Sequence, residues 1–245
     1  MKLVLAEPRL LKDSISIISE LVNEVTFKID KDKIEIVAMD PANVAMVVFK
    51  LLSSAFVEYD VKESEDVAVN LDNLNQVLKR AKPSDTVTIE LVENKLKITL
   101  RGESTRTFSL SLIDADESEQ KIPELKFDTK VEMLSIALTE AIDDMDIVAE
   151  SVALMAEASK LTIQSEGRFN TARVELPKND NTVITTKDKV SAKYSIEYLK
   201  KIVKGSKLAE TVVLNFGKEY PLRADYKIMD RLMLSFILAP RVDND

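Results

Sequence analysis

The sequence predicts an α+β protein with two similar domains, in which helices lie on one face of antiparallel sheets. A short signature, an acidic residue just before a valine, recurs about every sixty residues, at Val25, Val87, Val152 and Val212. Each valine opens a run of alternating apolar and polar residues, the pattern of half-buried antiparallel strands. An amphipathic helical pattern precedes each run.

Four helices are expected, over residues 8–22, 71–82, 132–145 and 195–204. Pro8 would lie in the first turn of the first helix, where its missing N–H costs nothing. Apolar residues at helical spacing mark the face that each helix buries. These residues are Leu11, Ile15, Ile18 and Val22; Leu71, Leu74 and Leu78; Leu134, Ala137, Leu138 and Ala141; and Tyr198 and Ile202, with Leu199 as a further candidate.

Two further strands are expected after each valine strand. The second strands centre on Ile34, Leu96, Leu161 and Leu222, and the third strands span 44–51, 107–113, 171–176 and 232–238. The repeated unit is therefore strand–helix–strand–strand–strand, present four times, and two consecutive units make a domain. The segment 114–124 is acidic and contains Pro123, which indicates an extended linker. We predict an N-terminal domain over 1–113, a linker over 114–124 and a C-terminal domain over 125–245.

The composition excludes most enzyme chemistry. The 245 residues include no His, no Cys and no Trp, so a Ser-His-Asp triad, a cysteine nucleophile and the usual zinc sites are impossible. The four glycines are too far apart for a phosphate-binding glycine loop. No apolar run approaches a membrane span, so we expect a soluble intracellular protein. Acid–base chemistry by Asp and Glu, a carboxylate-bound Mg²⁺ and no catalysis at all are the possibilities that the composition leaves open. Of these we expect a protein that is not an enzyme and needs no metal and no cofactor.

Basic residues recur on the expected polar helix faces, although the net charge is −8. An assembly that turned these faces inward would concentrate positive charge and suit sequence-independent contact with phosphates. The alternative is an ordinary solvated face on each helix. The candidate residues for facing a nucleic acid are Arg9, Lys12, Lys79, Arg80, Lys82, Lys200, Lys201, Lys204 and Lys207.

The third helix is different because its polar face is acidic. Glu140, Asp143 and Asp144 lie there, with Asp146 just beyond. A carboxylate-bound Mg²⁺ and a hydrolase built on it are conceivable. Adjacent carboxylates on one helix do not converge on a metal unless a second element adds ligands, so we favour a solvated acidic face.

Several motifs, in order along essentially the whole chain, resemble the archaeal and eukaryotic sliding clamps of the proliferating cell nuclear antigen family. The most specific is the segment 34–47, Ile-Glu-Ile-Val-Ala-Met-Asp-Pro-Ala-Asn-Val-Ala-Met-Val. Residues 70–74, 77–81, 191–199 and 238–242 are similar to the same family, and the overall character resembles its archaeal members.

The resemblance implies the DNA clamp fold and a trimeric ring of identical or related subunits, a choice that the sequence leaves open. Duplex DNA would pass through the ring without sequence preference, and a clamp loader would place the ring on DNA. DNA polymerase, flap endonuclease and DNA ligase would be tethered through short hydrophobic-aromatic peptides. The acidic third helix departs from the family, which usually has basic residues there. A checkpoint-type clamp loaded at DNA damage is the alternative. The location would be the cytoplasm at the archaeal nucleoid, or the nucleus in a eukaryote.

The resemblance also implies two sets of contact residues. The peptide pocket would be lined by Met39, Asn43, Met46, Ile122, Pro123, Phe127, Pro221, Leu238, Ala239 and Pro240. The subunit interface would pair two edge strands and include Arg106, Phe108, Leu110, Leu112, Thr171, Arg173, Val174 and Leu176.

Overall fold

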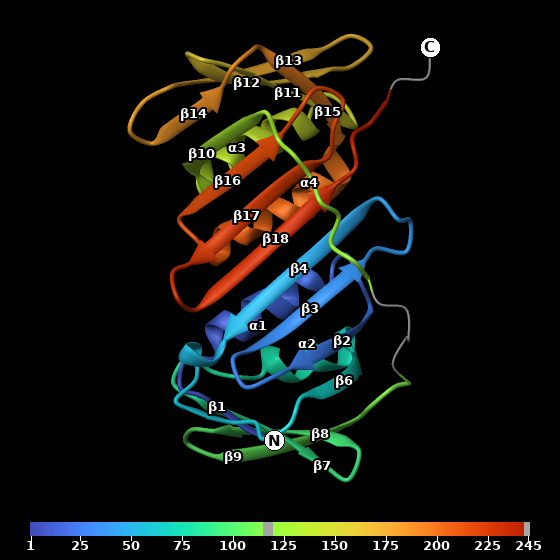
Figure 1. Ribbon diagram of the computed structural model, residues 1–245, viewed down its shortest axis with the longest axis vertical. Helices are drawn as coiled ribbons and strands as arrows, with labels where there is room; N and C mark the ends of the chain where they lie inside the picture. Colours follow the sequence, from blue (N-terminus) through green and yellow to red (C-terminus); the bar gives the residue numbers. More distant parts are fainter. Residues whose placement is uncertain (115–119, 243–245) are drawn as a thin grey trace. The chain divides into compact units, whose positions relative to one another are not determined.

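The computed structural model describes residues 1–114 and 120–242, and residues 115–119 of the predicted linker lie outside the described residues. The chain divides into two compact units (Figure 1). The first unit comprises Met1–Pro41, Val47–Ile122 and Ile228–Leu234, and the second comprises Ala42–Met46, Pro123–Lys227 and Ser235–Asp245.

The first unit contains two helices and two antiparallel sheets. Its helices are α1 (Arg9–Ile18) and α2 (Leu71–Lys79). One sheet has the order β5-β1-β7-β8-β9, and four more strands follow one another as β4-β3-β2-β6. The strands are β1 (Lys2–Leu5), β2 (Glu24–Ile29), β3 (Lys33–Met39), β4 (Ala45–Leu52), β5 (Glu58–Asp60), β6 (Glu65–Asn70), β7 (Thr86–Val92), β8 (Lys95–Arg101) and β9 (Thr105–Ser111).

The second unit repeats this arrangement. Its helices are α3 (Ser135–Asp146) and α4 (Ile196–Ile202), and the 3₁₀ helix η2 (Val203–Lys207) continues α4. The strand orders are β13-β12-β11-β15 and β14-β10-β16-β17-β18. The strands are β10 (Thr129–Leu134), β11 (Ser151–Glu157), β12 (Lys160–Glu166), β13 (Thr171–Pro177), β14 (Thr182–Thr186), β15 (Val190–Ser195), β16 (Thr211–Phe216), β17 (Leu222–Ile228) and β18 (Leu232–Leu238).

The predicted fold class is confirmed. The strand–helix–strand–strand–strand unit occurs twice in each half, and in each half the two helices pack against each other on one side of the strands (Figure 1). The alternation seen in the sequence is the alternation of burial: β3, for example, buries Ile34, Ile36 and Ala38 and leaves the residues between them part-exposed. The additions to the prediction are β5, β14, the short 3₁₀ helix η1 (Ser53–Ala55) and η2.

The predicted helices were too long, for local reasons. After α1 the N–H groups of Glu20 and Leu21 bond three residues back instead of four. Helix α2 ends at Lys79 because Pro83 disfavours helical backbone at Lys82 and the Asp85 carboxylate takes the Lys82 N–H, at 2.8 Å. Helix α3 starts at Ser135, not at residue 132, because β10 extends to Leu134 between β14 and β16.

The buried helix faces were predicted well, with three exceptions. Leu11, Ile15 and Ile18 are at most 2% exposed, as the spacing required. The prediction for Tyr198 was wrong: α4 buries Ile196, Leu199 and Ile202, and Tyr198 is part-exposed. Leu134 and Ala137 are also only partly buried.

Candidate DNA-facing, peptide-binding and interface surfaces

Lys12 lies at the contact between α1 and α2. It is part-buried, and its ammonium group donates hydrogen bonds to the backbone oxygens of Lys79, at 3.4 Å, and Ala81, at 2.9 Å. The C-terminal end of a helix carries carbonyl groups without helical partners and attracts cations. Lys12 therefore stabilises the packing of α1 on α2 as well as adding positive charge there. Arg9, one turn earlier, faces Asp13 at 3.4 Å.

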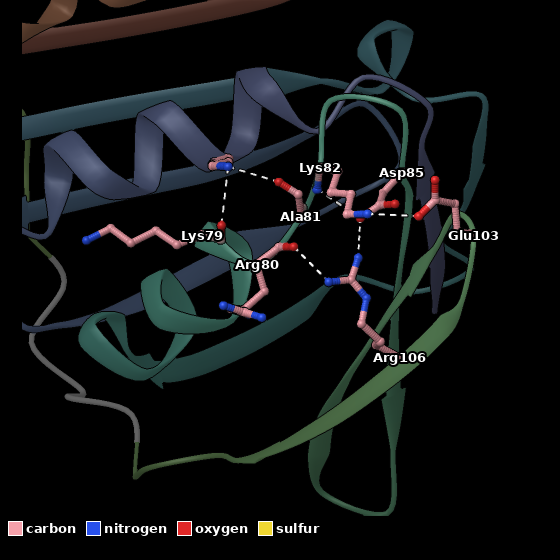
Figure 2. A network of polar contacts seen from close by, with 8 residues as sticks. Lys79, Arg80, Ala81, Lys82, Asp85, Glu103 and Arg106 are labelled. Atoms are coloured by element: carbon pink, nitrogen blue, oxygen red, sulfur yellow. Dashed lines mark hydrogen bonds and ion pairs between the residues drawn. The ribbon is translucent and has the colours of Figure 1, made fainter.

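Lys79 and Arg80 are the available cations among the predicted DNA-facing residues of the first unit. Both are exposed, and in Figure 2 their side chains extend away from the polar network around them. Within the part of the chain that the structure describes, no hydrogen bond or ion pair to either cationic group is found. Both can reach an approaching anion without first breaking a bond inside the protein.

Figure 2 shows how the neighbouring residues are held. The Asp85 carboxylate, 1% exposed, forms an ion pair with Arg106 of β9. Arg106 also donates to the backbone oxygen of Arg80 at 2.9 Å, so β9 is fastened to the end of α2. Lys82 pairs at 3.0 Å with Glu103, whose side chain is 90% exposed. Arg106, expected at a subunit interface, therefore has a clear structural contact inside its own unit.

In the second unit, Lys200 and Lys201 form contacts inside the protein that, among the described residues, Lys79 and Arg80 of the first unit do not form. The Lys200 ammonium lies 2.6 Å from a carboxylate oxygen of Asp146, and this hydrogen bond raises the pKa of Lys200. Lys201 faces Glu197 at 3.4 Å and lies over the Tyr198 ring at 5.3 Å, a cation–π geometry. Lys204 and Lys207 lie on η2, where Lys207 is exposed and Lys204 is part-exposed.

The acidic face of α3 is a solvated surface with one specific contact. Glu140, Asp143 and Asp144 are exposed, and Asp146 pairs with Lys200. Among residues 1–114 and 120–242, no group of three or more His, Cys, Asp or Glu side chains is placed to hold a metal ion. The arrangement gives no support to a hydrolase centred on these carboxylates.

Within the second unit, several of the predicted pocket residues gather near the C-terminal strand. Ala239 donates from its backbone N–H to the Val44 oxygen at 2.9 Å, next to Asn43, which has a φ of 57°. Phe127 meets the ring of Tyr220 edge to face at 5.8 Å, and Pro221 follows Tyr220 directly.

The other predicted pocket residues differ in exposure. Met46 and Leu238 are buried at 4% and 0% exposure, so in this structure they belong to the core. Pro123 and Ala239 are exposed, Pro240 is part-exposed, and in the first unit Met39 is part-exposed and Ile122 is exposed.

Tyr220 was not among the predicted residues. It is part-exposed, and its hydroxyl lies 3.4 Å from the Lys126 N–H. Its backbone oxygen accepts a 2.8 Å hydrogen bond from the Tyr194 hydroxyl. The signal that could have found it is an aromatic residue directly before Pro221.

The two strands expected at the interface lie at sheet edges, β9 in the first unit and β13 in the second. In β9, Arg106, Phe108 and Leu110 alternate with exposed Thr and Ser residues, and Leu112 follows the strand. In β13, Val174 and Leu176 are part-exposed, and Thr171, Arg173 and Glu175 are exposed. Hydrogen bonds from Lys160, at 2.7 Å, and Arg173 lower the pKa of Glu175 to about 2.

The structure defines a duplicated α+β protein, with basic residues on helices of both units and an edge strand open in each. Residues 1–120 match the family model "Proliferating cell nuclear antigen, N-terminal domain", and residues 121–241 match the corresponding C-terminal domain. The chain belongs to the proliferating cell nuclear antigen family and has its DNA clamp fold. Among the described residues, no helix is long and apolar enough to cross a membrane.

Archaeal relatives are similar over nearly their whole length. A protein of Thermococcus gammatolerans named DNA polymerase sliding clamp is 38% identical over 234 residues, 94% of each chain. A protein of the same name from Nanoarchaeum equitans is 36% identical over 249 residues, 99% of this chain and 100% of the relative. The crystal structure of PCNA from Thermococcus kodakaraensis gives a TM-score of 0.92 at 30% identity and covers 98% of this chain and 99% of that one.

Proposed function

We infer that this chain is a DNA sliding clamp, a processivity factor that encircles duplex DNA and tethers replication and repair enzymes to it. The observation that carries this is the match of both halves to the clamp family, with cationic helix surfaces present in both units of a chain whose net charge is −8. Relatives named DNA polymerase sliding clamp do not favour the checkpoint-type alternative. A non-catalytic family fits the absence of His and Cys.

We propose that the helices α1 to α4 face the DNA. Long basic side chains that contact phosphates give affinity without sequence reading, and each contact makes binding more sensitive to salt. Lys79 and Arg80 are exposed without a partner in the described structure, which favours them as the strongest phosphate contacts. Arg9, Lys12, Lys82, Lys200, Lys201, Lys204 and Lys207 would add to the same field.

We propose a ring of three chains, identical or related, closed by pairing β9 of one chain with β13 of the next. An edge strand presents unpaired N–H and C=O groups, and pairing between chains satisfies them. The two clamp domains would be 1–113 and 125–245, joined by 114–124. A clamp loader would open the ring, and the complex would act at the archaeal nucleoid.

Client enzymes would bind through short peptides with a hydrophobic-aromatic plug. DNA polymerase, flap endonuclease and DNA ligase are the expected clients. Methionine suits a pocket with several clients because its flexible side chain adapts to different shapes. Tethering raises the effective concentration of an enzyme at DNA to about the millimolar range, without bond chemistry in the clamp.

The deciding experiment is topological. The chain, with its related subunits where needed, is loaded by a clamp loader onto nicked circular DNA, and retention is measured by gel filtration before and after the circle is cut. A clamp stays on the circle and slides off the linear product. Equal loss from both forms, or equal retention, would contradict an encircling ring.

Variants then test which residues face the DNA. Replacing Lys79, Lys200 and Lys204 with Ala should weaken retention on linear duplex DNA, where topology does not hold the ring, equally on all sequences and flatten its dependence on salt. Arginine at the same three positions keeps the charge and serves as the control. A salt slope unchanged by alanine would count against inward-facing helices. Native mass spectrometry reports the number of subunits.

A further inference from the structure

The first unit has an open cavity beside its unpaired edge strand. Its volume is about 310 Å³, and it is lined by Asn73, Gln76 and Val77 of α2 and by Phe108 and Leu110 of β9. On the neighbouring strand β8 the inward side chains Ile98 and Leu100 are 0% exposed, whereas Phe108 and Leu110 are only partly buried. The sheet therefore ends with apolar side chains that nothing in the described unit covers.

The second unit carries an apolar projection beside its own edge strand. In the turn between β12 and β13, Phe169 is 85% exposed, and Arg168 stacks on its ring at 5.1 Å. Ile147, after α3, is 82% exposed. The two segments touch, because a Cβ added at Gly167 would lie 2.4 Å from the Val148 oxygen. Monomeric proteins rarely expose neighbouring large apolar side chains without a use.

The direction of β9 decides which end of the cavity a partner strand would meet. Arg106, near the start of β9, bonds to Arg80 at the C-terminal end of α2. Ile113, after the end of β9, donates to Ala68, just before the N-terminal end of α2. A β13 strand paired antiparallel with β9 would therefore begin at the Leu110 end, which brings the turn before β13 to the first turn of α2.

Charge complementarity favours the same register. Asp72 is exposed in the first turn of α2, next to Asn73 of the cavity. Arg168 is exposed next to Phe169. When Phe169 enters the cavity, its neighbour Arg168 reaches the side where Asp72 lies, and opposite charges select this register over a shifted one.

We propose that the cavity of Asn73, Gln76, Val77, Phe108 and Leu110 receives the Phe169 side chain of a second copy of this chain. This rests on the proposed ring, because it assumes that β9 of one copy pairs with β13 of the next. Phe169 is the aromatic anchor of the contact, and the strand pairing supplies main-chain hydrogen bonds around it. The contact is between different patches, so it joins the copies head to tail, as a ring requires, instead of forming a symmetric dimer.

The absence of cysteine from the chain gives a direct test. Two single-cysteine variants, Gln76→Cys and Phe169→Cys, are mixed at a chain concentration at which the Phe169→Ala variant still associates, because the cysteine replaces the aromatic anchor, and are treated with a short bismaleimide. We expect a cross-linked pair containing one copy of each variant. The matched control replaces Phe169→Cys with Met229→Cys, because Met229 is 86% exposed in a different turn. It should give no pair with Gln76→Cys above background.

A second measurement removes the Phe169 side chain and needs no cross-linking reagent. Phe169→Ala should weaken association of the copies about 30-fold or more in sedimentation velocity, the effect of losing a central aromatic anchor. Met229→Ala should leave association unchanged. Since both side chains are exposed, circular dichroism should show both variants folded.

The outcomes separate this inference from the proposed function. Copies that associate without the Gln76–Phe169 cross-link, and with unchanged affinity in Phe169→Ala, would overturn the inference and leave the clamp intact. A chain that never associates with its own copies would also overturn it. The clamp itself fails only if rings on circular DNA do not form with related subunits either.

Discussion

The ion pair between Arg106 and Asp85 offers a substitution that separates folding from assembly. Arg106→Leu keeps the aliphatic part of the side chain and removes the cation. The Asp85 carboxylate, 1% exposed, pairs with Arg106 and accepts a hydrogen bond from the Lys82 N–H at 2.8 Å. In the variant it would keep only the second of these contacts. The hydrogen bond from Arg106 to the Arg80 oxygen, at 2.9 Å, would also be lost.

The expected cost is about 3 kcal/mol. Removing one partner of a buried ion pair costs about 3–5 kcal/mol, because a buried charge is left without compensation. Arg106 is 27% exposed, so water reaches its end of the pair, and the lower limit applies. In a unit of this size a loss of that magnitude lowers the melting temperature by about 10 °C.

Two comparison variants make the reasoning specific. Asp85→Asn should cost less, about 1–2 kcal/mol, because Arg106 can turn to solvent whereas a buried carboxylate cannot. The double variant should cost less than the sum of the two single variants. Arg101→Leu, at an exposed position on the adjacent strand β8, should change stability by less than about 0.5 kcal/mol.

The assay is urea unfolding followed by far-ultraviolet circular dichroism at several chain concentrations, since the chain has no Trp for fluorescence. A lower urea midpoint for Arg106→Leu that persists at all concentrations supports the fold-stabilising role. If the midpoint does not change and only the association of copies weakens, the reasoning is refuted, and Arg106 acts at the subunit contact as first expected.

Three further substitutions test other contacts. Asp146→Asn should release Lys200 from its 2.6 Å partner, strengthen DNA retention and steepen its logarithmic salt slope by about 1 per chain, and no change would place Lys200 away from the DNA. Gly205→Ala should cost about 1–3 kcal/mol in thermal unfolding, because the added Cβ would lie 2.4 Å from the Tyr226 ring, whereas Ser206→Ala should be nearly neutral. Tyr226→Phe should be neutral or stabilising at pH 7, because the buried Tyr226 hydroxyl has no hydrogen-bond partner among the described residues. Burial raises the pKa of Tyr226, so the neutral phenol is favoured in the folded protein. Through this group the free energy of unfolding is therefore at its full value below the unfolded pKa of about 10 and falls as the pH rises above it. The Phe variant should lose less stability between pH 9 and about 11.

The repeated fold could be predicted because its signals are local and periodic. In each helix and each long strand, the spacing of the apolar residues indicates which face is buried. The strand Leu232–Leu238 was predicted with the same bounds that the structure has. The short strand β5 gave no such signal: Glu58 and Asp60 are exposed, and only Tyr59 is part-buried. Its place depends on pairing with β1, which no pattern within Glu58–Asp60 encodes.

Side-chain partners across elements were beyond the reach of the sequence. Asn75 is a polar residue of α2, yet it is 7% exposed and donates to the Ser19 hydroxyl at 3.0 Å. Lys12 was expected as a phosphate contact on a polar helix face, and its protein acceptors lie sixty-seven and sixty-nine residues later in the chain. In both cases the partner comes from another helix, so only the packing of α1 on α2 reveals the contact.

These partners change how the cationic helices would act on DNA. A lysine that already holds a protein acceptor must give up that bond, wholly or in part, before it contacts a phosphate, so its net gain is small. Lys12, Lys82 and Lys200 are of this kind, whereas Lys79 and Arg80 are available. A protein that must stay on DNA by topology and still move along it gains from phosphate contacts that are few and easily exchanged. If α3 and α4 face the DNA as proposed, Asp146 at the end of α3 would compete with phosphate for Lys200 and keep that contact weak.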